Sequence, residues 1–508
     1  MTASPIPTRE RTIRNIFFSL ASQILTLATS FFTTPIIVKK LGLDAYGIVI
    51  LLSTILSYMN FISAGLSGAT IQYLTECVSA GDWERFRQIL WSSFITYLSI
   101  GLVGGTVLFL LTPTLISSWF NIPLDLRSVS ATALYIFILI YIVALTYETF
   151  KAIAWAYNRI DLAALLSLAN GMLQPIGAML MVLLGYGIIG VSIATLATNI
   201  VVLILGFLIA RKLYRNWGRP TYNMQIMKPL FMYGGWINIT YIVNQAVQFL
   251  DKVFIGSYLN SAAVGYYNLS VTIPLNLRII HGAFASSAFP LIVNLRTRAA
   301  TTTEIFHLLS RFARSTQLLL LPAVLFFTLW GDTFLSAWIS DEVAENGKMT
   351  IRLASMAMLL VGTNAIHHIF LRAWGRSDLD TAVYTGNAVA YIPVLYLLIR
   401  WLGISGAGWA LLFCSIVEMF LILNFVKRLV NIPISAWFPV ILNRHVIILT
   451  AIGIPLRLMQ SYLAWSPLWK LALFGGMFLV LSSVYVWFIG FSKSDRDSIL
   501  KTILGRFM

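Results

Sequence analysis

Hydrophobic residues in this chain form long continuous runs separated by short polar segments. Each run of about 18 or more apolar residues is long enough to cross a hydrocarbon layer of about 30 Å as a helix. The pattern therefore predicts an all-α polytopic membrane protein. About fourteen membrane-spanning helices are expected, at residues 15–38, 45–74, 89–112, 130–150, 162–184, 188–210, 229–251, 264–294, 315–331, 353–371, 380–399, 406–426, 445–463 and 471–491.

The composition supports a membrane protein, because 58% of the residues are hydrophobic and only 11% are charged. Soluble domains average roughly 45–50% apolar and 25% charged residues. The first fifteen residues lack the apolar core and cleavage site of a signal peptide, so the first helix is expected to target the chain. The two cysteines, Cys77 and Cys414, are expected on the cytoplasmic side, where neither a disulfide nor a metal cluster forms readily.

The net charge of +16 could indicate a nucleic-acid partner, but the basic residues follow membrane orientation instead. With the N-terminus inside, 25 of the 35 basic residues fall in cytoplasmic segments and nine in external ones. This bias is a positive-inside signal. It predicts that both termini lie in the cytoplasm and that no nucleic acid is bound.

Three sequence blocks occur twice, in the same order and at nearly constant offsets of 218, 217 and 216 residues. Six predicted helices separate equivalent points, so the copies have the same orientation, with an axis along the membrane normal. We expect an N-terminal lobe at 1–214, a C-terminal lobe at 215–430, and two further helices with a cytoplasmic tail at 431–508. Two such lobes enclose a central cavity, which favours a transporter. The pairs are KKLGLDAYGIVILLSTI (39–55) with SYLNSAAVGYYNLSVTI (257–273), AYNRIDL (156–162) with AWGRSDL (373–379), and GIIGVSIA (187–194) with GISGAGWA (403–410).

Arg278 is the strongest candidate for a cavity residue, because a guanidinium at mid-bilayer costs at least about 2.5–3.5 kcal/mol unless it is wet or paired. Its repeat partner is Asn60, and His281, one turn further on, is matched by Ser63. The alternative is a buried structural ion pair. Polar residues also follow one face of the helix at 229–251, where they line the cavity or join neighbouring helices. The two chosen as cavity residues are Asn244 and Gln248.

Three carboxylates in predicted helices are candidates for coupling or gating. Glu148 lies three residues from Lys151, which suits a local ion pair, and Asp251 lies near the external end of its helix. Glu418 has no basic residue within one turn. The adjacent histidines 367 and 368 have no carboxylate at ligand spacing, so no metal site is expected.

Two cytoplasmic turns each carry an arginine followed two residues later by an aspartate. These are Arg159 with Asp161 and Arg376 with Asp378, at equivalent repeat positions. We expect each pair to clamp a tight turn between helices, with a gating role as the alternative.

The segments TTPIIVKKLGLDAYGIVILLSTI, LDKVFIGSYLNSAAVGYYNLSVTIPLNLR and FLSAWI resemble the polysaccharide-exporter branch, of the Wzx or O-antigen flippase type, of the multidrug/oligosaccharidyl-lipid/polysaccharide transporter superfamily. The resemblance implies a flippase of the bacterial inner membrane that moves an undecaprenyl-diphosphate-linked O-antigen, capsule or exopolysaccharide unit outward by alternating access. The implied partners are this lipid-linked oligosaccharide, membrane lipids and other polysaccharide-assembly proteins.

Related lipid-carrier flippases use cationic cavity residues, one of them on the eighth helix, where Arg278 stands. The resemblance thus implies that Arg278 binds the diphosphate, with His281 or an entrance residue such as Arg14 helping it. No cofactor is expected, and coupling to a proton, to sodium or to the membrane potential stays open.

Two other functions compete with this interpretation. A multidrug or organic-cation exporter of the same superfamily would favour a cavity carboxylate, whereas the central charge here is positive. A membrane-embedded polysaccharide polymerase would carry a large external loop or an acidic catalytic motif, and the sequence has neither. We therefore expect a transporter and not an enzyme.

Overall fold

The computed structural model of this chain describes residues 9–441, 443–491 and 496, apart from the side chains of residues 9–17, 20, 61–62, 64, 233–248 and 281–287. Every regular element in the described ranges is helical. The chain forms two compact units, Met1–Gly265 and Tyr266–Met508, and each is considered separately.

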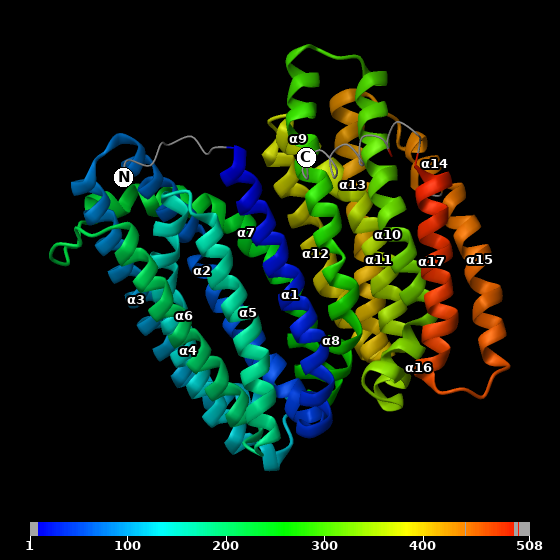
Figure 1. Cartoon of the computed structure of the whole chain (residues 1–508), viewed down its shortest axis with the longest axis horizontal. Coiled ribbons are helices and arrows are strands. Elements are labelled where there is room, and N and C mark those ends of the chain that lie inside the picture. Colours follow the sequence, from blue (N-terminus) through cyan, green and yellow to red (C-terminus); the bar gives the residue numbers. More distant parts are fainter. Residues whose placement is uncertain (1–8, 442, 492–495, 497–508) are drawn as a thin grey trace. The chain divides into compact units, whose positions relative to one another are not determined.

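The first unit contains a group of long helices that pack along their lengths (Figure 1). α1 packs on α5, α4 packs on α3 and α6, and α2 packs on α4 and α7. Its α-helices are α1 (Arg9–Leu41), α2 (Leu43–Ala80), α3 (Trp83–Thr114), α4 (Arg127–Ala156), α5 (Ile160–Leu183), α6 (Gly187–Leu213) and α7 (Met224–Tyr258), with short turns at Leu115–Trp119 and Leu124–Leu126.

The second unit is built around α10 and α11, which pack on each other and on α9, while α13 joins α11 to α12. The C-terminal helices α15 and α17 pack on α10. The helices are α8 (Ser261–Asn276), which crosses the unit boundary, α9 (Arg278–Thr297), α10 (Thr302–Trp338), α11 (Asp341–Ala373), α12 (Ser377–Leu402), α13 (Ile404–Val430), α14 (Phe438–Ile441), α15 (Arg444–Ser461), α16 (Pro467–Lys470) and α17 (Gly476–Tyr485), with single turns at Ile434–Trp437, Leu471–Gly475 and Val486–Gly490.

The predicted all-α membrane fold is confirmed. Twelve helical segments among the described residues are long and apolar enough to cross a membrane. The span predicted at 229–251 is α7. The predicted lobe boundaries at 214 and 430 stay a prediction.

The single helix predicted at 264–294 is wrong in one respect, because it is interrupted at Leu277 between α8 and α9. The Leu277 N–H donates to the Pro274 carbonyl at 3.1 Å, and the Ile280 N–H donates to the Leu277 carbonyl at 3.1 Å. These bonds span three residues instead of four, so the backbone tightens after the proline, whose ring is poorly accommodated inside an α-helix. The equivalent helix α2 has Leu56 at the proline position and runs without interruption.

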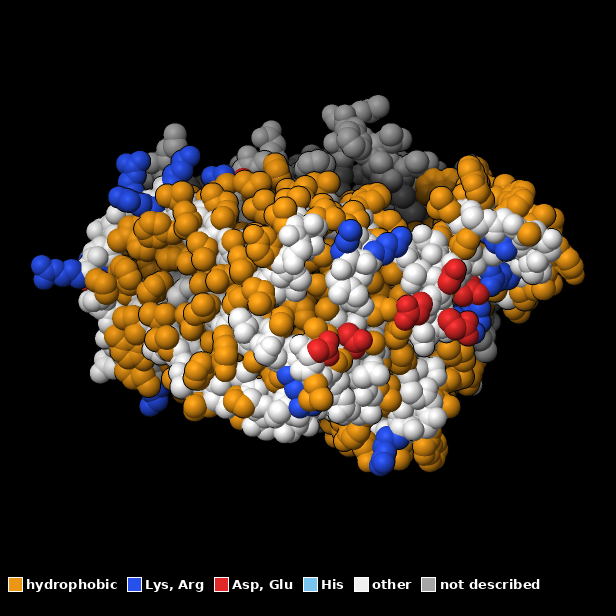
Figure 2. All heavy atoms as spheres, turned by 90° about the horizontal axis from the view of Figure 1, so that it is seen from below, with side chains coloured by type: hydrophobic (Ala, Val, Ile, Leu, Met, Phe, Trp, Pro, Cys, Tyr) orange, Lys and Arg blue, Asp and Glu red, His pale blue; other side chains and the backbone are white. Residues whose placement is uncertain are grey.

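The outward faces of the helices are strongly apolar. Large hydrophobic side chains are exposed along them, including Phe32 at 70%, Leu110 at 70% and Trp401 at 78%. Figure 2 shows hydrophobic side chains over much of the visible face, interrupted by acidic and basic ones. Exposed apolar surface of this extent suits contact with lipid and not with water.

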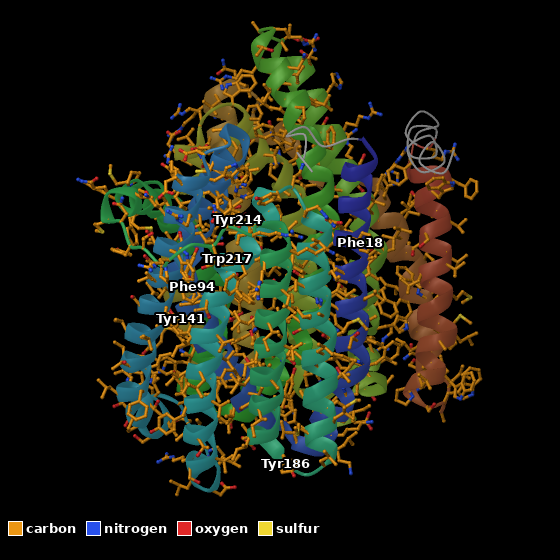
Figure 3. The ribbon with its side chains drawn as sticks, turned by 60° about the vertical axis from the view of Figure 1, so that its left-hand side comes forward. Phe18, Phe94, Tyr141, Tyr186, Tyr214 and Trp217 are labelled. Carbon is orange, nitrogen blue, oxygen red and sulfur yellow. The ribbon has the colours of Figure 1, made fainter. Side chains whose placement is uncertain are left out.

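Aromatic side chains hold the segment that follows α6 against the first unit. Tyr214 and Trp217 lie at one end of α6, and the exposed Tyr186 lies at the other (Figure 3). The Trp217 indole donates to the Tyr214 carbonyl at 2.7 Å, and the Trp91 indole donates to the Trp217 carbonyl at 2.7 Å. Aromatic rings at both helix ends suit the two interfaces of a bilayer.

The repeat seen in the sequence recurs in the local geometry of two matched turns, those that precede α5 and α12. Asn158 and Gly375, which are repeat partners, both have positive φ values, of 54° and 79°. The following N–H groups also bond equivalently, with Arg159 donating to the Ala154 carbonyl at 2.8 Å and Arg376 to the Leu371 carbonyl at 2.9 Å. A left-handed backbone conformation favours glycine and asparagine, which explains why one repeat has asparagine and the other has glycine at this position.

A second repeat signature is a reciprocal contact between the starts of α2 and α8, both inside the first unit. A Cβ on Gly47 would lie 1.7 Å from the Ser261 carbonyl oxygen, and a Cβ on Gly265 would lie 3.0 Å from the Leu43 carbonyl oxygen. Both pairs are related by the same offset of 218 residues. A contact that recurs with its partners exchanged is the pattern that a two-fold axis produces.

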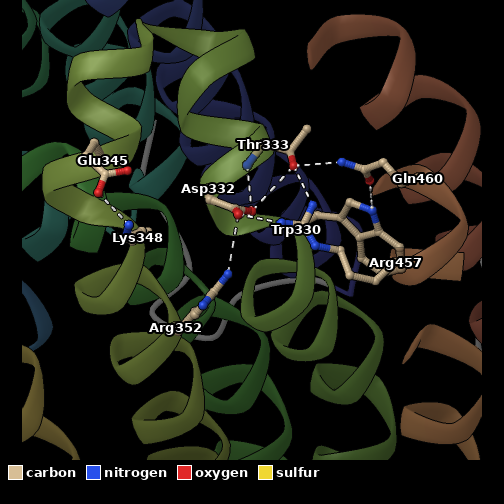
Figure 4. Close-up of polar contacts among 8 residues, drawn as sticks. All are labelled: Trp330, Asp332, Thr333, Glu345, Lys348, Arg352, Arg457 and Gln460. Atoms are coloured by element: carbon tan, nitrogen blue, oxygen red, sulfur yellow. Dashed lines mark hydrogen bonds and ion pairs between the residues drawn. The ribbon is translucent and has the colours of Figure 1, made fainter. Parts of the chain in front are cut away.

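The C-terminal helix α15 is attached to α10 and α11 by a polar network (Figure 4). Asp332 pairs with Arg457 and, at 3.3 Å, with Arg352. The Trp330 indole donates to the Gln460 amide oxygen at 2.5 Å, and the Gln460 amide donates to the Thr333 hydroxyl at 3.0 Å. Charges on three helices, α10, α11 and α15, therefore join those helices.

We expect Gly47→Ala to destabilise the protein, because the added Cβ would meet a backbone carbonyl that cannot rotate away. Overpacking of this kind costs about 1–3 kcal/mol. The matched control is Gly68→Ala in the same helix, where nothing lies within 4 Å of the added atom. The control should be neutral or stabilising by up to about 1 kcal/mol. Thermal unfolding in detergent distinguishes the two, and equal melting temperatures would contradict the close contact.

We expect Gln460→Leu to lower the thermal stability of the second unit, since Gln460 and Trp330 are both buried. The change leaves the indole N–H without its acceptor, at a cost of about 1–3 kcal/mol. Met459→Leu, on the exposed face of the same helix, serves as the control and should leave the melting temperature unchanged. Unfolding curves of both variants that coincide with the wild type would show that the network contributes nothing.

Candidate functional site

Arg278 is the first residue of α9, directly after the interruption at Leu277. Its side chain is half-buried in the second unit. The interruption follows from Pro274, so the proline determines where α9 begins and therefore where the Arg278 side chain is attached. A cation at the first turn of a helix opposes the helix dipole, and the combination of the two favours an anion nearby.

The repeat partners of Arg278 and His281 lie on α2 in the first unit. Asn60 is half-buried, and Ser63 is 3% exposed, with its hydroxyl donating to the Asn60 carbonyl at 2.9 Å. The serine hydroxyl thus bonds within its own helix. That these residues line a shared cavity stays a prediction.

Four of the predicted site residues have side chains outside the described part of the structure. The cavity role of three of them and the entry role of the fourth remain predictions. They are His281, Asn244, Gln248 and Arg14.

Glu148 forms the ion pair that its spacing predicts. The Lys151 ammonium lies 2.5 Å from one carboxylate oxygen, and the Ser67 hydroxyl donates to the other at 2.7 Å. The pair links α4 to α2 near the predicted cytoplasmic face, and the expected ion pair is confirmed. Whether it also couples or gates transport is untested.

Asp251 on α7 is 2% exposed, so its carboxylate is buried within the protein. The Lys252 backbone N–H donates to it at 2.7 Å. The Lys252 ammonium lies 5.2 Å from the centre of the Phe249 ring. A coupling or gating role for Asp251 stays a prediction.

Both predicted arginine–aspartate turns are confirmed as ion pairs. Arg159 donates to Asp161 at 2.9 Å, and Arg376 donates to Asp378 at 2.8 Å. The hydrogen bond that Arg376 donates to the Asp378 carboxylate raises the pKa of the Arg376 guanidinium above its ordinary value. The pairs sit at the N-terminal ends of α5 and α12, where a carboxylate also favours the helix dipole.

Glu418 has a partner that its own helix does not reveal. His368 on α11 lies between two carboxylates, with Nδ1 2.6 Å from Asp380 Oδ1 and Nε2 2.8 Å from Glu418 Oε1. Arg372 donates to the second oxygen of Asp380 at 2.6 Å, and Asn387 donates to the second oxygen of Glu418 at 3.0 Å. Three helices of the second unit therefore meet at one buried imidazole.

Sequence reasoning missed this cluster because its members are 12 and 50 residues apart from His368. The available signal was the presence of Glu418 and of the histidine pair on two separate predicted helices. Within the described residues, no group of three or more His, Cys, Asp or Glu side chains is arranged to hold a metal ion.

The family described as polysaccharide biosynthesis protein matches residues 36–345, which is more than half of the chain. The chain belongs to this family. The match covers the whole first unit beyond Pro35 and continues into α11. The predicted resemblance to polysaccharide exporters is thereby confirmed.

Two relatives of this polysaccharide biosynthesis protein match over most of their length. The membrane protein EpsK of Bacillus subtilis is 23% identical over 368 residues, covering 69% of this chain and 71% of EpsK. A protein of Haloferax volcanii named probable flippase AglR is 20% identical over 410 residues, covering 79% of this chain and 81% of AglR.

Among solved structures, the lipid II flippase MurJ in an inward closed conformation is similar, with a TM-score of 0.73. The alignment has 15% sequence identity and covers 92% of this chain and 99% of MurJ. At this identity the likeness shows the fold. Fold and family together are those of a multi-pass membrane protein of polysaccharide biosynthesis.

Proposed function

We propose that this protein is a flippase that carries an undecaprenyl-diphosphate-linked oligosaccharide from the inner to the outer leaflet by alternating access. Its membrane is the bacterial inner membrane, with both termini in the cytoplasm, and the other partners are membrane lipids and polysaccharide-assembly proteins. The family supports a role in polysaccharide biosynthesis. The likeness to MurJ and the relative named as a probable flippase support a flippase fold.

The observation that carries the proposal is the position of Arg278 at the interruption between α8 and α9. Lipid cannot replace the hydrogen bonds that a guanidinium makes with water. Such a charge is therefore found within a membrane protein where it meets water or an anion. A diphosphate supplies that anion, and its oxygens match the two parallel N–H groups of arginine.

The sign of the charge separates this function from export of an organic cation. A cationic substrate needs a carboxylate that faces it, whereas a diphosphate needs a fixed positive charge. The buried carboxylate Asp251 is the residue that would serve a cation exporter. Arg278 and Asp251 variants therefore test the two functions separately.

We expect Arg278→Ala to abolish polysaccharide export and Arg278→Lys to retain part of it. Alanine removes the counter-charge of the diphosphate, while lysine keeps the charge but loses the planar fork. Lost pairing of a charged group costs several kcal/mol in such surroundings, so the alanine variant should fall by about a hundredfold or more. The measurement is surface polysaccharide in a strain that lacks its own exporter.

The control for this experiment is Arg298→Ala, which removes an exposed arginine of the same unit that pairs with Glu304. It should export normally, and membrane levels of all variants are measured alongside. Full export by a well-expressed Arg278→Ala protein would show that Arg278 is a structural charge. The multidrug exporter would be favoured if the Asp251→Asn variant lost export and its resistance to cationic drugs changed in parallel.

A further inference from the structure

The cluster of His368, Asp380 and Glu418 needs an additional proton. With a neutral imidazole and two charged carboxylates, the three side chains hold one proton too few for their hydrogen bonds. A neutral imidazole has one N–H and one acceptor nitrogen, and a carboxylate has only acceptors. Both ring nitrogens lie within 2.8 Å of a carboxylate oxygen. One of these contacts would join two acceptors, unless a proton sits on the second ring nitrogen or on a carboxyl group.

The charges around the imidazole balance only with that proton present. Arg372 and a protonated His368 neutralise Asp380 and Glu418, whereas loss of the proton leaves one uncompensated negative charge. His368 is 6% exposed and Asp380 is 3% exposed, while the Glu418 side chain is 12% exposed, so most of the cluster is shielded from solvent. A buried unpaired charge is strongly destabilising, so the three helices must rearrange when the proton leaves.

The other groups that face the cluster do not supply a replacement proton. On α12 the ring of Tyr384, which carries a titratable phenol, stacks on His368 with 4.6 Å between the ring centres. On α11 the neighbouring His367 packs edge-on against Trp437. The remaining titratable neighbours are Cys414, one turn from Glu418 on α13, and Arg296 of α9, which lies over Gly375.

The first repeat has a permanent cation where the second has this imidazole. Lys151 precedes His368 by 217 residues, the offset of the adjoining repeat block, and it pairs with Glu148 on its own helix. An ammonium keeps its proton throughout the physiological range, whereas an imidazole gains and loses one near neutral pH. Only the second unit therefore carries a pairing at this position that a proton can make or break.

We propose that His368, Asp380 and Glu418 form a proton-binding site through which a proton gradient drives the flippase. One proton enters the cluster from the external side and leaves to the cytoplasm, and α12 and α13 close on α11 when it is bound. This rests on the proposed function for the driven step, although the proton-dependent closure itself needs no substrate.

The first experiment measures the closure without any lipid-linked sugar. Amide hydrogen exchange of the full chain in lipid nanodiscs is followed between pH 6 and 9 and corrected for intrinsic exchange rates. If opening releases one proton, the opening equilibrium at the start of α12 should rise about tenfold per pH unit over part of this range. The same slope should appear with and without sodium.

Two variants remove the proton requirement by different chemistry. In Glu418→Gln the amide N–H can donate to one ring nitrogen while the other donates to Asp380, so a neutral imidazole is fully bonded. In His368→Lys a permanent cation takes its place. Both should lose the pH slope while remaining folded, and the control His367→Gln, on the next residue of α11, should keep it.

The second experiment places the same variants in the export assay. Glu418→Gln and His368→Lys should reduce surface polysaccharide about tenfold or more, because a cluster that neither binds nor releases a proton cannot be driven. Three results would overturn the proton site. They are an opening equilibrium of the wild type that does not change with pH, an equally pH-dependent equilibrium in Glu418→Gln, and exchange protection that follows sodium instead of pH. A lost slope with normal export would overturn the coupling but leave the flippase intact. Failure of the wild type to export would refute the proposed function, and the exchange data would still decide the proton site.

Discussion

Hydrocarbon offers no hydrogen bonds, so a polar or charged side chain inside a membrane helix must find its partner within the protein. This constraint explains the placement of the described charges. Glu148 takes its partner from its own helix, Asp332 takes arginines from two other helices, and Glu418 takes a histidine from α11. The pairings of Asp332 and Glu418 therefore hold neighbouring helices together.

The apolar pattern predicted the helices well, because a hydrocarbon layer fixes both their length and their continuity. The repeat also appears in the structure as paired features, such as the left-handed turns at Asn158 and Gly375, since equal local sequence produces equal local bonding. Ion pairs at short spacing, such as Arg159 with Asp161, could also be predicted. These successes all concern residues close together in the chain.

The interruption at Leu277 and the cluster at His368 could not be predicted in the same way. Pro274 is tolerated in many membrane helices, and only the bonds it displaces show that the backbone tightens here. The His368 cluster depends on how three helices turn toward one another, and hydrophobic periodicity does not specify that rotation to within one side chain. In the sequence, the cluster is visible only as isolated polar residues in separate apolar runs.

The reciprocal contact of Gly47 and Gly265 has a consequence for how this protein can change over time. The contact is made twice, once at Gly47 and once at Gly265. Residue size is therefore limited at the same aligned position in both copies of the repeat. A larger residue in one copy cannot be offset by a smaller residue in the other, since each glycine faces a carbonyl oxygen and not its repeat partner's side chain. Both copies of the duplicated sequence must therefore keep a small residue at this aligned position, which Gly47 and Gly265 provide.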